Sequence, residues 1–190
     1  MFPTGLQQSI LNDDSLTFAE KIISARSEGG EKTLHPGDIT VLEADMAMAQ
    51  DSTGPLAIKV LNEMGVERVR DPTRVHLVID HTYPASDEKV ANLHNLIRQF
   101  VKKTGCRLVE GTISHQHLLE SHIVPGMILF GADSHTSQGG AMGAFATGIG
   151  GSEMAGLWAS GKLWVRVPES LAGQLYPYEL ASGSLTDNGL

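Results

Sequence analysis

The sequence predicts an α/β fold in which short strands alternate with helices and form a mostly parallel sheet. Short apolar runs alternate with stretches that have helical spacing. Glycine is frequent, at 21 of 190 residues, and aromatic residues make up only 5%, which suits tight strand–helix turns better than a β-sandwich. Polar clusters follow several apolar runs, as they do at the ligand-binding edge of a parallel sheet.

Capping residues and proline define the first elements. Thr17 or Ser15 can cap a helix that runs to about Ser27, where a pair of glycines follows. A Pro-Gly turn precedes a short strand at residues 39–42. Pro55 then fits the first turn of a second helix, because proline is tolerated where the helix needs no backbone N–H donor.

The middle of the chain carries the clearest strand and the clearest helix. Residues 75–79 are almost continuously apolar, which suits a strand that is buried on both faces. Residues 87–104 have apolar side chains at helical spacing and basic residues near their end, and Gly105 terminates the helix. Two further short strands are expected at residues 107–110 and 127–131, so strand and helix continue to alternate.

A glycine-rich segment, residues 139–151, opens a last helix that is expected to end near Gly161. The segment has a dinucleotide-like look, but it does not match G-x-G-x-x-G after a strand, and no acidic residue ends a following strand at the required spacing. We therefore interpret it as close packing of a helix start against other backbone.

Three polar clusters follow predicted strands, and we expect them to converge at one edge of the sheet. They are Asp80-His81, His115-Gln116 and Asp133-Ser134-His135. A single aspartate or histidine at a strand end is as often a helix cap or a structural residue. Three histidines, two of them with aspartate nearby in the sequence, favour acid–base or metal chemistry, because imidazole titrates near pH ~6.5. Adjacent residues need not touch, so the pattern does not establish an Asp80–His81 contact.

The other histidines are expected to have no catalytic role. His76 lies within a strand and is interpreted as a core or interface residue. His94 lies on the long helix and is expected to face solvent. His117 and His122 belong to a short helix after His115, and the remaining histidine, His35, lies in a turn.

Composition excludes several classes of function. The net charge of −8 argues against a nucleic-acid surface and against an anionic membrane surface. The single cysteine, Cys106, is expected to be a buried inert thiol, and it can form neither an intramolecular disulfide nor, by itself, the ligand set of an iron–sulfur cluster. No apolar run approaches the ~20 residues of a membrane span. The N-terminus resembles neither a signal peptide nor a mitochondrial presequence, so the cytoplasm is the expected location.

The chain resembles the aconitase family of iron–sulfur hydro-lyases from about Leu16 to Ser170. The resemblance rests on motifs at the predicted strand ends and in the glycine-rich segment, among which the D-S-H-T block followed by G-A-F-A-T-G-I-G is highly specific. The motifs are QDSTGP at 50–55, VIDH at 78–81, SHQ at 114–116, PG at 125–126, GADSHT at 131–136, GGA at 139–141, GAFATGIG at 143–150 and GK at 161–162.

This resemblance implies a three-layer α/β/α domain over residues 1–170, with an irregular tail at residues 171–190. It implies loss and readdition of water on a small hydroxy-polycarboxylic acid, with 3-isopropylmalate preferred over homocitrate or citrate. His81 would protonate the leaving hydroxyl, supported by Asp80. His115, Asp133 and His135 would orient the substrate and a metal-bound water, and Gln50 and Ser134 would hold substrate carboxylates.

The resemblance also implies parts that this chain lacks. Large subunits of the family are about twice as long, and their [4Fe-4S] cluster cysteines, most carboxylate-binding arginines and the serine base lie beyond the matching region. The expected partners are therefore the remaining enzyme domains or a small swivel-domain subunit, besides the carboxylic-acid substrate. No metal ligand for the cluster is assigned in this chain.

Two other functions remain open from the sequence alone. The chain could be a truncated family member without catalysis that acts as a binding or regulatory remnant. It could instead carry an independent site for a divalent metal ion, built from His81, His115, Asp133 and His135.

Overall fold

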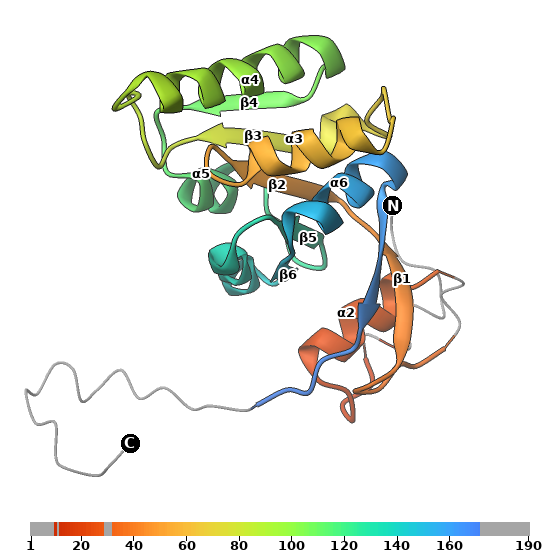
Figure 1. The fold of residues 1–190 in the computed structure, drawn as a ribbon. Helices are drawn as coiled ribbons and strands as arrows, with labels where there is room; N and C mark the ends of the chain where they lie inside the picture. The colour runs from red at the N-terminus through yellow and green to blue at the C-terminus, as the bar shows by residue number, and fades with distance from the viewer. Residues whose placement is uncertain (1–9, 11, 29–31, 172–190) are drawn as a thin grey trace, which may run out of the picture.

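A computed structural model describes residues 10, 12–28 and 32–171 of the chain, and within them it has two β-sheets and their covering helices (Figure 1). Elements labelled η are short 3₁₀ helices. In chain order the elements are α2 (Phe18–Arg26), β1 (Ile39–Glu43), β2 (Met46–Gln50), α3 (Gly54–Glu63), η1 (Pro72–Arg74), β3 (Val75–Ile79), α4 (Glu88–Thr104), β4 (Arg107–Glu110), α5 (Ser114–Ser121), β5 (Ile128–Gly131), η2 (Ser134–Met142), β6 (Phe145–Gly148), α6 (Gly151–Ser160) and β7 (Lys162–Arg166).

The main sheet has five strands in the order β4-β3-β2-β5-β6, and every neighbouring pair is parallel. The register places Gln50 beside Val78 and Gly131 beside Gly148. All five strands therefore end at the same edge of the sheet, which is the edge where polar loops of α/β proteins gather.

Helices cover both faces of this sheet, so the domain has three layers. On one face, Leu77 of β3 packs in a core that includes Ile97 of α4 and Met154 of α6. On the opposite face, Val78 of β3 packs in a second core that includes Leu118 of α5. Figure 1 shows α3, α4 and α6 together on the first face. The predicted α/β/α class is confirmed.

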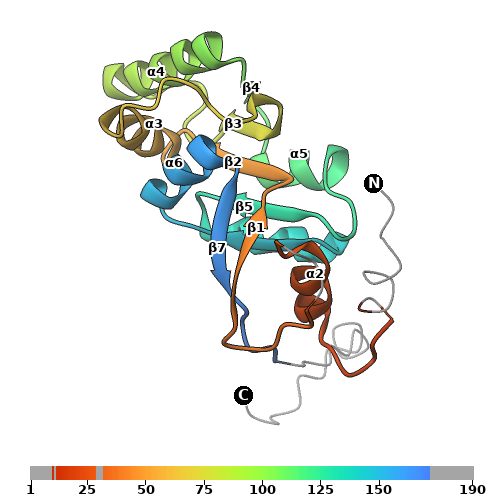
Figure 2. The ribbon, with the colours of Figure 1, turned by 90° about the vertical axis from the view of Figure 1, so that its right-hand side faces the viewer.

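The sequence did not indicate strand β2, which lies at the centre of the sheet and is buried throughout. The predicted strand at residues 39–42 exists as β1, but it lies outside the main sheet. It pairs with β7 as an antiparallel ribbon, which Figure 2 shows running away from the parallel strands beside α2. Side-chain alternation cannot distinguish a strand of the main sheet from one in such a ribbon.

Helix α4 has the predicted length and ends. The side chain of Asp87 accepts the Val90 backbone N–H at 3.0 Å, and Gly105 follows the helix with a left-handed φ of 81°. The face with Leu93 and Ile97 at helical spacing is only partly the buried one: the helix buries His94, Ile97 and Phe100, whereas Leu93 is 41% exposed.

Two glycines allow the strand-end loops to lie against the sheet. A Cβ atom at Gly131 would overlap the side chain of Thr136. A Cβ at Gly148 would lie 2.7 Å from the backbone oxygen of Asp133, closer than real side chains approach. This close packing agrees with the interpretation of the glycine-rich segment.

Within the described part of the chain, no helix combines the length and the apolar character needed to cross a bilayer. The expected irregular tail at residues 171–190 falls, apart from Leu171, outside the described residues. The boundary at residue 170 therefore stays a proposal.

Candidate active site

Asp80 and His81 follow β3 directly, and their side chains form an ion pair that the sequence alone did not establish. Nδ1 of His81 lies 2.7 Å from Oδ1 of Asp80. The other carboxylate oxygen of Asp80 accepts the backbone N–H of Ser114 at 2.8 Å. Because both oxygens of Asp80 are engaged, its orientation is fixed. Nδ1 of His81 is occupied, which leaves Nε2 as the atom that can exchange a proton with a ligand.

The charges of this pair suit a proton donor. The hydrogen bond to Asp80 raises the pKa of His81 above its ordinary value despite the lowering effect of burial, and the charges of Asp80, Asp51 and Asp133 add to the rise. Burial raises the pKa of Asp80, but hydrogen bonds from His81 and Ser114 outweigh it and hold that pKa below its ordinary value. His81 is thereby biased toward its protonated form.

A second carboxylate, Asp51, supports the turn that carries His81. It is buried, and its oxygens accept the backbone N–H groups of His81 at 3.3 Å and Thr82 at 3.0 Å. The same carboxylate lies 3.6 Å from Nδ1 of His81. Asp51 follows β2 directly. Because the sequence did not predict β2, it also did not identify Asp51 as an acidic residue at a strand end.

His94 lies beneath Asp51, and the expectation that it faces solvent is wrong. Its side chain is 2% exposed, and Nε2 lies 3.4 Å from Oδ2 of Asp51, an ion-pair distance without hydrogen-bond geometry. His94, Ile97 and Phe100 are spaced as residues of one helix face, and so are Leu93 and Ile97. Periodicity therefore could not decide which of the two faces is buried. Helix α4 buries the face that contacts the polar turn.

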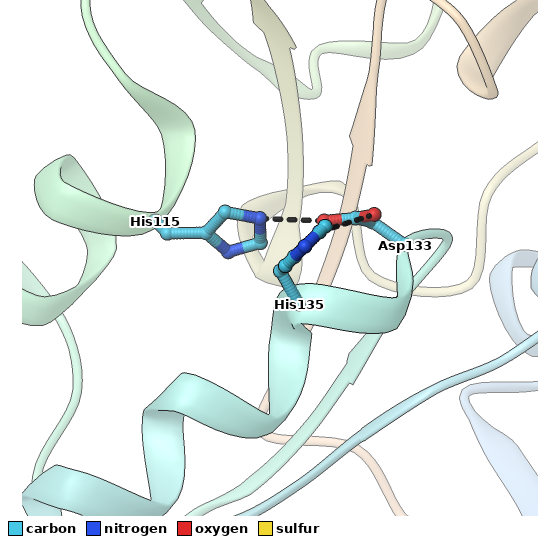
Figure 3. A group of neighbouring side chains, drawn as sticks. All are labelled: His115, Asp133 and His135. Carbon is cyan, nitrogen blue, oxygen red and sulfur yellow. Dashed lines mark hydrogen bonds and ion pairs between the residues drawn. The ribbon is translucent and has the colours of Figure 1, made fainter.

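Figure 3 shows a second cluster in which the carboxylate of Asp133 interacts with two histidines, His115 and His135. Nε2 of His115, in the first turn of α5, is 2.6 Å from Oδ2 of Asp133, and Nδ1 of His135 is 3.4 Å from Oδ1. Burial raises the pKa of Asp133, but the hydrogen bonds from both histidines outweigh it and keep that pKa below its ordinary value. His135 is the most exposed of the three.

The two clusters lie at the same sheet edge and are connected through the start of α5. Ser114 donates its backbone N–H to Asp80, while the next residue, His115, binds Asp133. The charge of Asp133 also contributes to the raised pKa of His81. The predicted convergence of Asp80-His81, His115 and Asp133-His135 is therefore present in the structure, whereas their catalytic roles remain predictions.

The two residues predicted to hold substrate carboxylates lie at the ends of neighbouring strands, but in different environments. Ser134 is exposed and lines an open cleft of about 520 Å³ together with Asp133, Gly148, Gly150 and other residues. Gln50 is buried, and within the described residues its Oε1 atom has no hydrogen-bond partner. Glu153, which no sequence pattern indicated, lines the same cleft and accepts the Gly150 N–H at 2.7 Å.

Both clusters have the compactness of a metal site. The ligand atoms of His115, Asp133 and His135 lie within 4.8 Å of one another, and so do those of Asp51, Asp80 and His81. The four-residue metal site that the sequence left open as an alternative is divided between the two clusters, because His81 groups with the carboxylates of Asp51 and Asp80. Neighbouring acids and bases account for both clusters without an ion.

Comparison with known proteins decides the family. The Aconitase family (aconitate hydratase) matches residues 20–177. The chain belongs to this family. It is 44% identical over 171 residues to the 3-isopropylmalate dehydratase large subunit of Aquifex aeolicus, covering 86% of this chain and 39% of that protein. It is 48% identical over 158 residues to large subunit 1 of this dehydratase from Methanopyrus kandleri, covering 81% of this chain and 37% of that protein. The chain spans about two fifths of the length of these relatives.

The aconitase family implies a [4Fe-4S] cluster in the full enzyme, and this chain's own residues do not fit one. Cluster binding normally takes several thiolates, and the sequence contains one cysteine. Cys106 is buried, and burial raises the pKa of its thiol, which disfavours the thiolate that binds iron. The prediction of a buried Cys106 is confirmed.

Proposed function

We propose that this chain supplies the proton-donating and substrate-orienting part of a hydro-lyase that removes water from, and returns it to, a small hydroxy-polycarboxylic acid. The carrying observation is the convergence at one sheet edge of the Asp80–His81 pair and the His115–Asp133–His135 cluster. Similarity to large subunits named 3-isopropylmalate dehydratase supports 3-isopropylmalate as the preferred substrate over homocitrate or citrate.

In this proposal His81 is the general acid. When the carbon–oxygen bond of the substrate breaks, the leaving hydroxyl takes the proton from Nε2 of His81 and departs as water. In the reverse direction the neutral imidazole accepts a proton from the incoming water. Asp80 holds the ring through Nδ1 and favours its protonated form, which is the form that must be present before dehydration.

The remaining site residues hold the substrate. Ser134 lines the open cleft and can donate its hydroxyl to a substrate carboxylate. Gln50 has unused hydrogen-bonding capacity, and its amide can donate to a carboxylate after rotation about its last torsion angle. His115 and His135, fixed by Asp133, orient the substrate hydroxyl or a water beside it.

The proposal places the rest of the catalytic machinery outside this chain. A [4Fe-4S] cluster, the base that takes the carbon-bound proton and a small swivel-domain subunit would complete the active site, and the chain alone would be inactive. We further propose that the enzyme acts in the cytoplasm. Anaerobic incubation of the purified chain with iron and sulfide should leave it without a cluster by iron and sulfide analysis, whereas a stoichiometric cluster would contradict this division.

The deciding experiment uses a complete large subunit that contains this segment, together with its small subunit. Formation of the unsaturated acid from 3-isopropylmalate, homocitrate and citrate would be followed by ultraviolet absorption. We expect the fastest turnover with 3-isopropylmalate. A complete, cluster-loaded assembly without hydro-lyase activity on any of the three acids would favour the alternative of a catalytically inactive remnant.

A further inference from the structure

A second histidine cluster lies away from the candidate active site, on the face of the sheet covered by α5. It consists of His76 in β3, His117 in α5 and His122 at the end of α5. The ring centroids of His76 and His122 are 4.7 Å apart, and those of His117 and His122 are 5.0 Å apart, both edge-on. His76 precedes the strand end by several residues, so the cluster lies toward the opposite end of β3 from Asp80.

The two half-buried rings of this cluster direct the same ring nitrogen at each other. Nε2 of His122 lies 3.3 Å from Nε2 of His117, and the two rings share one hydrogen bond whose proton a bound metal ion would replace. Two nitrogens bound at 2.0–2.1 Å to one tetrahedral zinc ion are about 3.4 Å apart. The pair therefore already has the separation of two zinc ligands, and because both residues are partly exposed, water can fill the other coordination positions.

His76 supports the pair from the protein interior. Its side chain is almost fully buried, and within the described residues its Nδ1 atom has no hydrogen-bond partner. Its ring packs edge-on against His122 and thereby limits the orientations that the His122 ring can adopt. An unpartnered buried nitrogen is costly to the fold, which indicates a purpose other than stability alone.

The electrostatic surroundings of this cluster differ from those of the candidate active site. Burial, with the charges of His122 and Arg107, lowers the pKa of His76 to about 4. Burial and the charges of His117 and Arg107 also lower the pKa of His122. No carboxylate is among the groups that shift either pKa, so these rings differ from the aspartate-paired histidines of the candidate active site.

We propose that His117 and His122 bind a Zn²⁺ ion between their Nε2 atoms, with His76 holding the ring of His122 in position. The ion would join α5 to the residue that follows it, and α5 also carries Ser114 and His115 at its other end. Imidazole nitrogens and water are ligands that Zn²⁺ takes in proteins, and hard ions such as Mg²⁺ and Ca²⁺ prefer oxygen ligands instead. Arg107 is the cationic neighbour that opposes it.

The test is a zinc titration of the purified, metal-free chain by calorimetry, with ¹⁵N-detected imidazole spectra to identify the binding rings. We expect the Nε2 signals of His117 and His122 to shift together on addition of ZnCl₂. His117→Gln and His122→Gln should each weaken this binding at least about tenfold. His135→Gln reports zinc at the candidate active site, and His35→Gln is the matched control on an exposed histidine elsewhere.

Two further variants sharpen the result. Arg107→Gln should tighten zinc binding roughly two- to threefold, because it removes one screened positive charge. His76→Phe keeps a buried ring but changes the support of His122, and it should weaken binding about tenfold, as loss of outer-sphere support typically does. If zinc shifts only His115 and His135, or if neither His117→Gln nor His122→Gln changes the affinity, the proposal is wrong. The spectra of the unaltered chain give this answer even if a variant fails to fold.

Discussion

Helix α5 connects two groups of histidines that have opposite electrostatic surroundings. At its start, His115 pairs with Asp133 close to His81, whose bond to Asp80 raises its pKa. At its end, His122 packs against other imidazoles, and burial lowers its pKa. The residue type is the same in both places. The difference shows that a nearby carboxylate raises the pKa of a histidine, whereas burial among imidazoles lowers it.

The largest expected effect is on catalysis at the carboxylate-paired end. In a complete enzyme that contains this segment, His81→Ala should lower kcat by ~10²–10⁴, the range for loss of a positioned acid–base group. KM should change less, because a proton donor acts mainly in the transition state. Steady-state kinetics measures both constants, after the cluster content of each preparation has been matched.

The control for this change is His35→Ala, because His35 is exposed and belongs to neither histidine group. It should leave kcat and KM unchanged. A near-normal kcat in His81→Ala would show that another group donates the proton.

The next effect concerns acid stability at the imidazole-rich end. The folded pKa of His76 is about 4, against an ordinary value of 6.5, so between these values the unfolded chain binds the proton and the folded chain does not. The free energy of unfolding should therefore fall as pH is lowered through this window, by about 3 kcal/mol in total. His122 adds to the same trend.

Urea unfolding of the chain at a series of pH values measures this slope. His76→Phe should flatten it between pH 6.5 and pH 4, because the titrating ring is absent. The pKa values of Asp80 and Asp133 are lowered, so their contributions to the free energy of unfolding would be lost only at more acidic pH. They can therefore be distinguished from the contribution of His76. An unchanged slope in His76→Phe would contradict the proposed neutral state.

A smaller effect is expected for the two neutral substrate-binding residues. Gln50→Ala and Ser134→Ala each remove a donor to a carboxylate that is present in both the ground state and the transition state. They should raise KM more than they lower kcat, by about 1.5–3 kcal/mol each. Kinetics of both variants in the complete enzyme tests this. Ser134 is exposed in the cleft, whereas Gln50 is buried. If Gln50→Ala changed kcat more than KM, Gln50 would position other residues and would not bind the substrate directly.

The smallest expected change is a titration shift. Asp80→Asn removes the carboxylate whose hydrogen bond raises the pKa of His81, so the pKa of His81 should fall in proton NMR titrations of the chain. The raised pKa stabilises the fold below the unfolded value and this stabilisation is lost as pH rises through the folded pKa. In Asp80→Asn, the free energy of unfolding should not show this decrease as pH rises through the folded pKa of His81. A His81 pKa that does not fall would assign its rise to Asp51 and Asp133 instead.

The sequence predicted the elements whose ends carry distinctive chemistry. Pro55 and Gly105 correctly defined helix ends, because proline restricts the backbone of a first helical turn and glycine allows the left-handed conformation after the last one. The apolar run of β3 was correctly interpreted as fully buried. The order of strands followed by polar residues also predicted that Asp80 and His115 meet at one edge, because all strands of a parallel sheet end there.

The features that the sequence concealed depend on tertiary contacts. Strand β2, with its Met-Ala-Met-Ala residues, has no strong strand propensity and forms because neighbours on both sides pair with it. His94 belongs to one of two equally regular faces of α4, and only packing against Asp51 decides which is buried. The Asp80–His81 bond depends on the side-chain torsions of a turn, which spacing does not determine.

The missing side chains of Gly131 and Gly148 limit how this domain can be redesigned. Both positions lie where the Asp133 loop rests on the strand ends, and the structure leaves no room there for even a methyl group. A library that aims at a new substrate should therefore leave these two glycines unchanged and vary the cleft residues that have space, such as Ser134, Ile149 and Glu153. New specificity in this fold therefore depends on keeping a hydrogen atom, in place of a side chain, at Gly131 and Gly148, as much as on the polar groups around the cleft.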